Sequence, residues 1–351
     1  MSNADHSISI DMSFWNTLKN RQKDGGEVFF AMAPMEDVTD TVFRQIISGC
    51  GAPDVFFTEF TNVEGLFSGN GAGFDVVSKR LKFAEVERPI VAQVWGLSPE
   101  NYCKAARLAV ERGFDGIDIN MGCPYPAVIK NCGGAALIKD PDLAREIVEA
   151  VMRGVENSAK EMGGKRIGVS VKTRIGFDRP AAEEWIGFLL KLKVDALTVH
   201  GRTAKQSYTV PADWETIKIS VGLRDKISPD TLIIGNGDIK NLAEGREKAQ
   251  ESGVDGVMIG RGVFGNPWVF NSEVEIEKVT VQQRLDLLLK HVALFEKTWD
   301  DSKNFAILKK FFKLYVQGFN GASELRAKLM ETKQADEVVS IINAWENPKL
   351  S

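Results

Sequence analysis

A cysteine followed by proline stands at the end of a predicted buried strand, in the sequence Ile119-Asn120-Met121-Gly122-Cys123-Pro124. The run 116–120 just before it is short and apolar, as strands covered on both faces are. Because proline continues neither strand nor helix, Cys123 is predicted on the loop that follows. A cysteine taken alone is more often buried and inert than reactive. The polar residues predicted around it favour a reactive thiol.

Eight short apolar runs alternate with amphipathic stretches. The runs predicted as strands are residues 28–33, 55–58, 90–95, 116–120, 168–172, 196–200, 231–235 and 256–260. Stretches typical of helices follow most of them, at 99–112, 141–157, 181–193 and 241–252. This alternation requires a parallel sheet. Eight units in about 240 residues predict a closed (β/α)8 barrel, and the lack of a GxGxxG turn argues against a Rossmann domain.

The ends of these strands carry an unusually polar set of residues. In a barrel, the active site gathers at the carboxyl ends of the strands. Each residue has an ordinary structural explanation when taken alone, but their convergence favours a functional site. The set comprises Pro34, Met35, Glu36, Glu59, Gln93, Asn120, Cys123, Lys172, His200, Asn236, Gly237, Asp238, Gly260 and Arg261.

The last two strands indicate the ligand. Glycine-rich turns follow them at 235–239 and 258–262, where backbone amides and Arg261 can hold a phosphate. Lys172 and Gln93, from strands in the middle of the barrel, suit the electron-rich N1–C2=O edge and polar rim of a flavin. The combination predicts FMN, which needs one phosphate site and no Rossmann fold.

Composition excludes several other classes of protein. The four cysteines form no CxxC pair and the three histidines are scattered, so neither a metal site nor a disulfide framework is predicted. No apolar run approaches the roughly eighteen residues of a membrane span, and acidic residues interrupt the first thirty positions. We therefore expect a cytoplasmic protein, and we expect it to be monomeric. The net charge of −4 argues weakly against nucleic-acid binding.

The barrel is predicted to occupy residues 28–267, between an extension at 1–27 and an all-helical domain at 268–351. In the extension, Phe14, Trp15 and Leu18 are candidates to pack on the barrel. Helical periodicity covers 281–297, 305–319 and 325–345. The segment 303–333 holds seven basic residues against two acidic ones, a local charge of +5. From charge alone, the ordinary interpretation of that segment is a solvated helix face.

From about residue 30 to 333 the sequence resembles the tRNA-dihydrouridine synthases. The order and spacing of many motifs make the resemblance specific. These motifs are Ala33-Pro34-Met35-Glu36-Asp37-Val38-Thr39-Asp40 with Phe43-Arg44, Thr58-Glu59-Phe60, Gln93, Asn120-Met121-Gly122-Cys123-Pro124 with Gly133-Gly134-Ala135-Ala136-Leu137, Val171-Lys172-Thr173-Arg174, His200-Gly201-Arg202-Thr203 with Gln206 and Asp213-Trp214, Gly235-Asn236-Gly237-Asp238-Ile239, and Ile259-Gly260-Arg261-Gly262.

The resemblance implies reduction of the C5–C6 double bond of particular tRNA uridines by reduced FMN, with NADPH as the reductant of the flavin. Cys123 is then expected to protonate C5, because a thiol near its normal pKa is an acid at neutral pH. Asn120 and Arg174 are expected to contact the substrate. The residues expected to hold FMN are Pro34, Met35, Glu36, Gln93, Lys172, His200, Asn236, Gly237, Asp238, Gly260 and Arg261.

The resemblance also assigns the helical domain to tRNA binding. Lys309 and Lys310 are expected to meet the RNA backbone while the target base turns out of its stack into the barrel. Members of the family often carry a histidine after this basic pair, whereas this chain has Phe311.

Three other functions fit parts of the sequence. An FMN barrel acting on a free pyrimidine, similar to dihydroorotate dehydrogenase, shares the fold and the cysteine but has no need of a helical domain. A catalytically silent RNA-binding barrel has no need of Cys123, Lys172 and Arg261. A phosphate-binding barrel without flavin leaves Cys123 unexplained.

Overall fold

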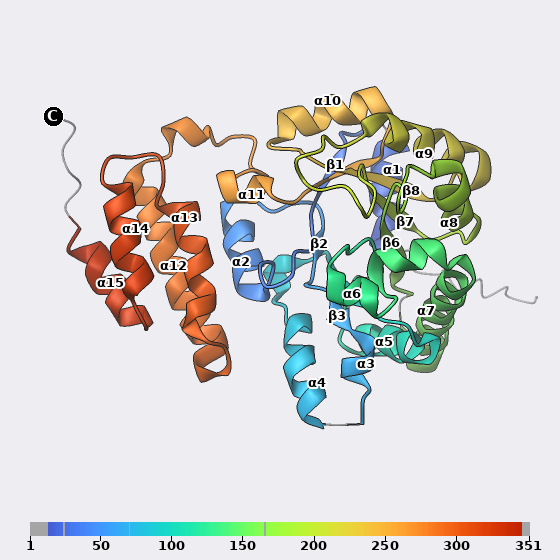
Figure 1. Ribbon diagram of the computed structural model, residues 1–351, viewed down its shortest axis with the longest axis horizontal. Coiled ribbons are helices and arrows are strands. Elements are labelled where there is room, and N and C mark those ends of the chain that lie inside the picture. Colours follow the sequence, from blue (N-terminus) through green and yellow to red (C-terminus); the bar gives the residue numbers. More distant parts are fainter. Residues whose placement is uncertain (1–12, 24, 70, 165, 346–351) are drawn as a thin grey trace, which may run out of the picture.

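The computed structural model describes residues 13–23, 25–69, 71–164 and 166–345. A parallel sheet forms the centre of the molecule, with strand order β1-β9-β8-β7-β6-β5-β4-β2 (Figure 1). A bridge between Ala31 and Val55 joins the two ends of this order, which closes the barrel. The strands are β1 (Phe29–Met32), β2 (Phe56–Phe57), β3 (Thr61–Asn62), β4 (Ile90–Trp95), β5 (Gly116–Met121), β6 (Gly168–Arg174), β7 (Ala196–His200), β8 (Leu232–Asn236) and β9 (Gly256–Ile259).

The predicted barrel is confirmed. Each of the eight predicted runs overlaps a strand. The short strand β3 follows the predicted run 55–58, and both β2 and β3 pair with β4. All strand pairs are parallel, so the carboxyl ends of the strands meet at one mouth.

Helices surround the sheet, and most of the longer ones begin at a side-chain cap. Asp40, Ser98, Asp140, Asp213 and Asn241 each accept a backbone N–H from three residues further on. The helices they start are α2 (Thr41–Cys50), α5 (Pro99–Glu111), α7 (Pro141–Met162), α9 (Trp214–Ile227) and α10 (Leu242–Ser252). The remaining helices of this part are shorter: α3 (Val63–Leu66), α4 (Gly71–Ser78), α6 (Pro126–Lys130), α8 (Gly187–Lys191) and α11 (Gly262–Gly265).

Helix α1 (Phe14–Lys23) closes the opposite end of the barrel. Trp15 is 1% exposed and packs among the first residues of several strands, including Phe29. A Cβ atom on Gly168 would lie 2.2 Å from Trp15 Cδ1, so only glycine at the start of β6 leaves room for the indole. The predicted packing of Phe14, Trp15 and Leu18 on the barrel is therefore observed, while residues 1–12 and 24 of the extension lie outside the described residues.

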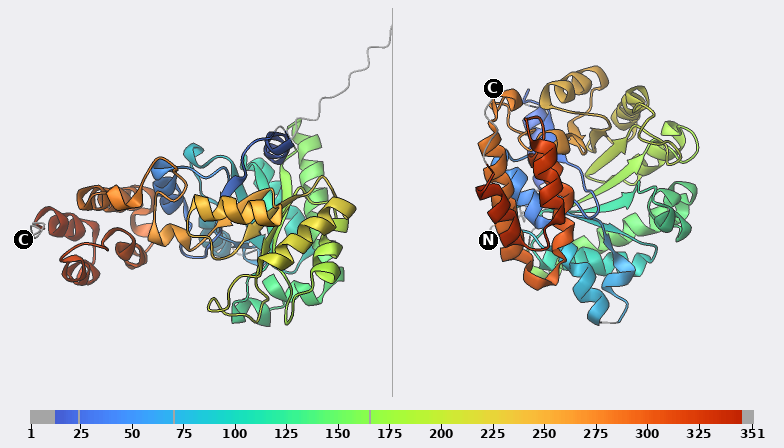
Figure 2. Two further views of the ribbon diagram at one scale, coloured as in Figure 1. Left: turned by 90° about the horizontal axis from the view of Figure 1, so that it is seen from above. Right: turned by 60° about the vertical axis from the view of Figure 1, so that its left-hand side comes forward.

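Four helices after the barrel form a separate group: α12 (Val281–Trp299), α13 (Phe312–Tyr315), α14 (Ala322–Glu331) and α15 (Ala335–Asn343). A 3₁₀ helix, η7 (Phe305–Phe311), precedes α13. The left view of Figure 2 shows this group at one end of the molecule, apart from the green and yellow helices of the barrel. Helix α12 packs against α2.

An aromatic cluster fills the contact between α2 and the C-terminal helices. The ring of Phe311 lies 4.8 Å from that of Phe43 and 4.9 Å from that of His291. Phe311 is 3% exposed, so the residue found where the family often has histidine is a packing residue here. His291 bonds to the hydroxyl of Tyr315 over 2.6 Å.

Candidate active site

A cavity of about 1180 Å³ opens at the mouth formed by the carboxyl ends of the strands. With the exception of Glu59, it brings together the predicted site residues of the barrel: Pro34, Met35, Glu36, Gln93, Asn120, Cys123, Lys172, Arg174, His200, Asn236, Gly237, Asp238, Gly260 and Arg261. Lys309 and Lys310 are not in its lining, because they lie on η7. Glu59 is also outside the lining and is 2% exposed.

The loop that carries Cys123 is fixed by hydrogen bonds to its backbone. The N–H groups of Gly122 and Cys123 donate to Asn120 Oδ1 over 3.1 and 2.9 Å. Ala135 N donates to the Cys123 carbonyl over 3.0 Å, and Gly134 between them has a φ of +56°. Burial raises the pKa of the Cys123 thiol, and Glu36 adds to the rise. The thiol is therefore protonated at neutral pH and can act as an acid.

Asn120 and Gln93 form a chain of side-chain hydrogen bonds that ends at Asp118. Asn120 Nδ2 donates to Gln93 Oε1 over 3.0 Å, and Gln93 Nε2 donates to Asp118 over 2.7 Å. Asp118 also accepts from Ser170 over 2.6 Å, and burial raises its pKa to about 6. The Asn120 amide is thus oriented from both sides, and its oxygen holds the cysteine loop.

Lys172 brings a buried positive charge into the cavity. Its Nζ donates to Asn236 Oδ1 over 3.2 Å, while Asn236 Nδ2 donates to the Met258 carbonyl over 2.9 Å. Within the described part of the chain, no carboxylate lies within ion-pair distance of this ammonium. Burial lowers the pKa of Lys172 to about 8. An anionic group entering the cavity would supply the counter-charge that the lysine lacks.

Arg202 organises the side of the cavity next to β7 and β8, and it was absent from the predicted site residues. It is 1% exposed and donates to the carbonyls of Val210 and Tyr208 and to Asp238. Its fourth contact, of 3.2 Å, is with His200 Nε2. Since arginine only donates, Nε2 must be an acceptor. Burial and neighbouring cations lower the pKa of His200, which makes it a neutral imidazole with its proton on Nδ1.

The turns after β8 and β9 fit a phosphate group. Asp238, at a φ of +58°, accepts from Arg261 over 3.0 Å and so orients that guanidinium. The backbone N–H groups of Gly237, Asp238, Gly260 and Arg261 donate no hydrogen bond within the described residues. A Cβ atom on Gly237 would lie 2.5 Å from Ala212 Cβ, so this turn requires glycine. Several unpaired N–H groups beside an arginine form a suitable cradle for an anion.

Arg174 binds the backbone of the loop that carries Cys123, so its side chain does not extend freely into the cavity. Its Nε donates to the Gly122 carbonyl over 2.7 Å and its Nη1 to the Thr203 carbonyl over 3.0 Å.

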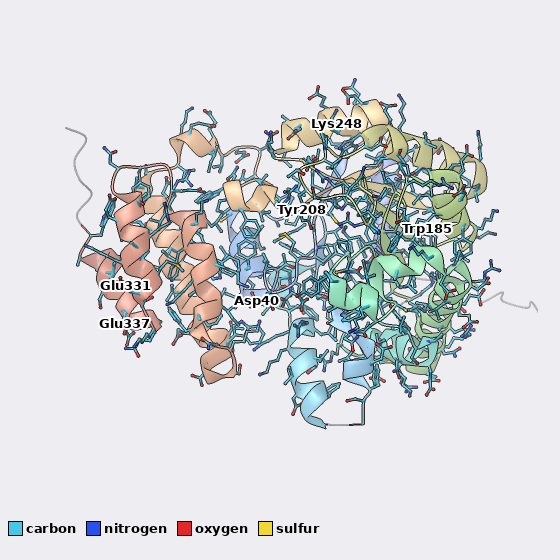
Figure 3. The ribbon with its side chains drawn as sticks, viewed as in Figure 1. Asp40, Trp185, Tyr208, Lys248, Glu331 and Glu337 are labelled. Atoms are coloured by element: carbon cyan, nitrogen blue, oxygen red, sulfur yellow. The ribbon has the colours of Figure 1, made fainter. Side chains whose placement is uncertain are left out.

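Two tyrosines at the rim of the cavity were not predicted. Tyr125 is 65% exposed and Tyr208 is 57% exposed (Figure 3 labels Tyr208), and the Arg261 guanidinium lies 4.5 Å from the Tyr208 ring centre.

Glu36 faces the cavity from the turn after β1. Its Oε1 accepts from Arg80 Nε over 2.8 Å, whereas its Oε2 is buried and has no hydrogen-bond partner within the described residues. Burial raises the pKa of Glu36, and burial raises that of the neighbouring Glu59 to about 7. Both carboxyl groups therefore hold their protons more tightly than they would in water.

The two lysines predicted to meet RNA both make contacts within the protein. Lys309 Nζ donates to the Met330 carbonyl over 2.7 Å. Lys310 Nζ donates to the Asp37 carbonyl, next to the cavity residue Glu36. Lys310 is exposed and Lys309 is half-buried, so both still reach the surface.

A family model described as dihydrouridine synthase (Dus) matches residues 31–347. The chain belongs to this family. It is 44% identical over 324 residues to "Probable tRNA-dihydrouridine synthase 2" of Bacillus subtilis (strain 168), covering 92% of this chain and 95% of the relative. It is 42% identical over 336 residues to "Probable tRNA-dihydrouridine synthase" of Staphylococcus aureus (strain MRSA252), covering 95% and 96% of the two chains.

Solved structures with low sequence identity share the fold of this dihydrouridine synthase family member. Histamine dehydrogenase from Rhizobium sp. 4-9 superposes with a TM-score of 0.53 at 12% identity, over 76% of this chain and 48% of that one. An amine oxidase acting on 6-hydroxypseudooxynicotine from Pseudomonas geniculata N1 gives a TM-score of 0.51 at 12% identity, over 69% and 46%. This chain therefore spans about half the length of both structures.

Among the described residues, no group of three or more histidine, cysteine, aspartate or glutamate side chains is arranged to hold a metal ion. No helix in that part of the chain is both long and apolar enough to span a membrane.

Proposed function

We propose that the protein is an FMN-dependent tRNA-dihydrouridine synthase, which reduces the C5–C6 double bond of particular uridines in tRNA at the expense of NADPH. The observation that carries the proposal is one cavity that holds a protonated thiol, a buried unpaired lysine and a phosphate cradle. The family match and the relatives over 92% and 95% of the chain support the substrate.

The residues of the cavity fit FMN. The amides of Gly237, Asp238, Gly260 and Arg261 would bind its phosphate together with the Arg261 side chain. Gln93 and Lys172 would face the pyrimidine part of the isoalloxazine ring, and Pro34, Met35, Glu36, His200 and Asn236 would line the remainder. When bound and reduced, FMN would supply the hydride for C6 of the uracil.

The side chains of the protein would supply the proton and the orientation. Cys123 Sγ would donate its proton to C5, because the raised pKa keeps the thiol protonated until it is needed. Asn120 would place that thiol, since its Oδ1 binds the two N–H groups of the loop. Lys172 would stabilise negative charge on the reduced flavin, and Arg174 would hold the loop against β6 while contacting the substrate.

The C-terminal helices would bind tRNA beside the cavity. A uridine within folded RNA is out of reach of a buried cofactor, so the base must leave its stack to react. Lys309 and Lys310, with the exposed Lys313 close by, would meet phosphates on that side, and Tyr125 and Tyr208 at the rim offer rings on which a base can stack.

The substrate class is tested by NADPH oxidation with the FMN-loaded protein and four alternative acceptors. Unmodified tRNA, orotate, uracil and uridine are supplied in turn under exclusion of oxygen. Stimulation by tRNA alone is expected. Stimulation by a free pyrimidine and not by tRNA would instead identify a small-molecule reductase.

A further inference from the structure

Asp40 lies where the barrel meets the C-terminal helices (Figure 3). It is 8% exposed, and its Oδ1 caps helix α2 by accepting Phe43 N over 3.0 Å. Its Oδ2 accepts from Trp299 Nε1 over 2.9 Å and from Lys303 Nζ over 3.0 Å. One carboxylate therefore joins the start of a barrel helix to Trp299, the last residue of α12, and to Lys303 shortly after it.

Lys303 belongs to the basic segment by sequence, but its charge is already neutralised. Its side chain is 18% exposed, and its Nζ lies 3.9 Å from the centre of the Trp299 ring in addition to its ion pair with Asp40. An RNA phosphate would have to displace a largely buried carboxylate to reach it. Lys313, in the same segment, is exposed and has no such partner within the described residues.

A short chain of contacts leads from Asp40 to the cavity. The adjacent Thr39 accepts Met35 N on its hydroxyl over 2.9 Å, and Thr39 N donates to the Met35 carbonyl over 3.0 Å. Met35 and Glu36 line the cavity, and Asp37, at a φ of +57°, accepts Lys310 Nζ on its carbonyl. The turn after β1 is thus fixed on one side by the C-terminal helices and faces the cavity with the other.

We propose that Lys303 is a positioning residue of the reductase site, which holds the Met35–Glu36 turn in place through Asp40, and that it is not an RNA contact. The effect on catalysis rests on the whole proposed function, whereas the effect on FMN affinity rests only on its FMN-binding part. Without the ammonium, Asp40 would keep a buried charge with only an indole and a backbone amide as partners. The cap of α2 and the turn next to it would then lose their fixed position.

The test is Lys303→Met, with Lys313→Met as the matched control. For Lys303→Met, we expect FMN affinity of the apoprotein and kcat for tRNA each to fall about tenfold. The KM for tRNA and the salt dependence of tRNA binding should stay within about twofold. Lys313→Met should show the reverse, with a higher KM and unchanged FMN affinity.

A second variant distinguishes loss of the ion pair from a general folding defect as the cause of weaker FMN binding. In Lys303→Met with Asp40→Asn no uncompensated charge remains, so FMN affinity should recover by at least about threefold relative to Lys303→Met. The proposal is overturned if Lys303→Met raises only the KM for tRNA, or if the double variant shows no recovery. The FMN titrations decide this even if the protein does not reduce tRNA, so failure of the proposed function is seen separately.

Discussion

At the scale of single residues, the cavity combines groups whose pKa values burial shifts from those in water. Burial raises the pKa values of Cys123 and Glu36 and lowers that of His200. Lys172 supplies a positive charge that no carboxylate of the described residues neutralises. A neutral acid beside a fixed cation is the arrangement that hydride addition followed by protonation requires.

The proton-donor role of Cys123 is tested by Cys123→Ser. We expect tRNA reduction to fall at least about 100-fold, the usual contribution of a general acid, with FMN affinity and flavin reduction by NADPH unchanged. The matched control is Cys132→Ser, an exposed thiol in the same loop region, which should retain activity. Full activity of the Cys123 variant would contradict the assignment.

The lowered pKa of Lys172 predicts a pH dependence of cofactor binding. An anionic partner raises the pKa of the lysine in the complex above the value of about 8 in the free protein. Its contribution to FMN binding is then fully present below pH 8 and is lost as the pH rises further. FMN titrations of the apoprotein from pH 6 to 10 should show this decline, and Lys172→Met should bind more weakly with the decline removed.

Residue types and strand ends were enough to predict that a set of polar side chains meets at the mouth of the barrel. The barrel mouth gathers the carboxyl ends of parallel strands, so the predicted residues from Pro34 to Arg261 share one cavity. Arg202, Arg80 and Lys303 were missed as organising residues because their partners are distant in sequence or lie on another turn. A buried ion pair between separate segments leaves no periodic pattern in the sequence.

At the scale of elements, helix α1 packs against the end of the barrel opposite the cavity and covers it. Trp15→Ala should lower the free energy of unfolding by about 3 to 5 kcal/mol, because it leaves a large void among the first residues of the strands. Thr17→Ala, an exposed position on the same helix, is the control and should change stability little. Urea unfolding of both variants provides the measurement, and equal stability of the two would show that α1 is not part of the core.

The sequence predicted helices less well after the barrel than within it. The single stretch 325–345 is interrupted at Thr332, where α14 ends before α15 begins, and 305–319 is largely a 3₁₀ helix followed by one turn of α13. Apolar periodicity continues across these breaks, since both sides bury residues in the same core. Helix α4 begins at Gly71, within a glycine-rich stretch whose residue types alone favour a loop.

At the scale of the whole molecule, the lysines of the segment 303–333 differ in their contacts. Lys303 and Lys310 contact residues at or next to the turn after β1. Lys310, Lys313, Lys328 and Lys333 are exposed. The net charge of −4 conceals this local arrangement. Binding of tRNA on these helices would therefore occur directly beside the cavity, with the Asp40 contacts between them.

Neutralising two of these lysines should weaken RNA binding without altering the flavin site. For Lys309→Gln with Lys313→Gln, we expect tRNA affinity to fall several-fold and the salt slope of binding to decrease by about 1.5. NADPH oxidation without tRNA should be unchanged. Lys248→Gln, on α10 over the barrel (Figure 3), is the control and should leave tRNA affinity as it is. Equal loss of both activities would contradict a separate RNA-binding surface.

The most direct test is mass spectrometry of tRNA treated with the FMN-loaded protein. Transcribed tRNA without dihydrouridine is incubated with NADPH, digested to fragments and compared with a reaction containing Cys123→Ser. We expect fragments in which a uridine has gained two hydrogens, in the wild-type reaction and at most in traces with the variant. An unchanged tRNA from a flavin-containing, NADPH-oxidising protein would contradict it.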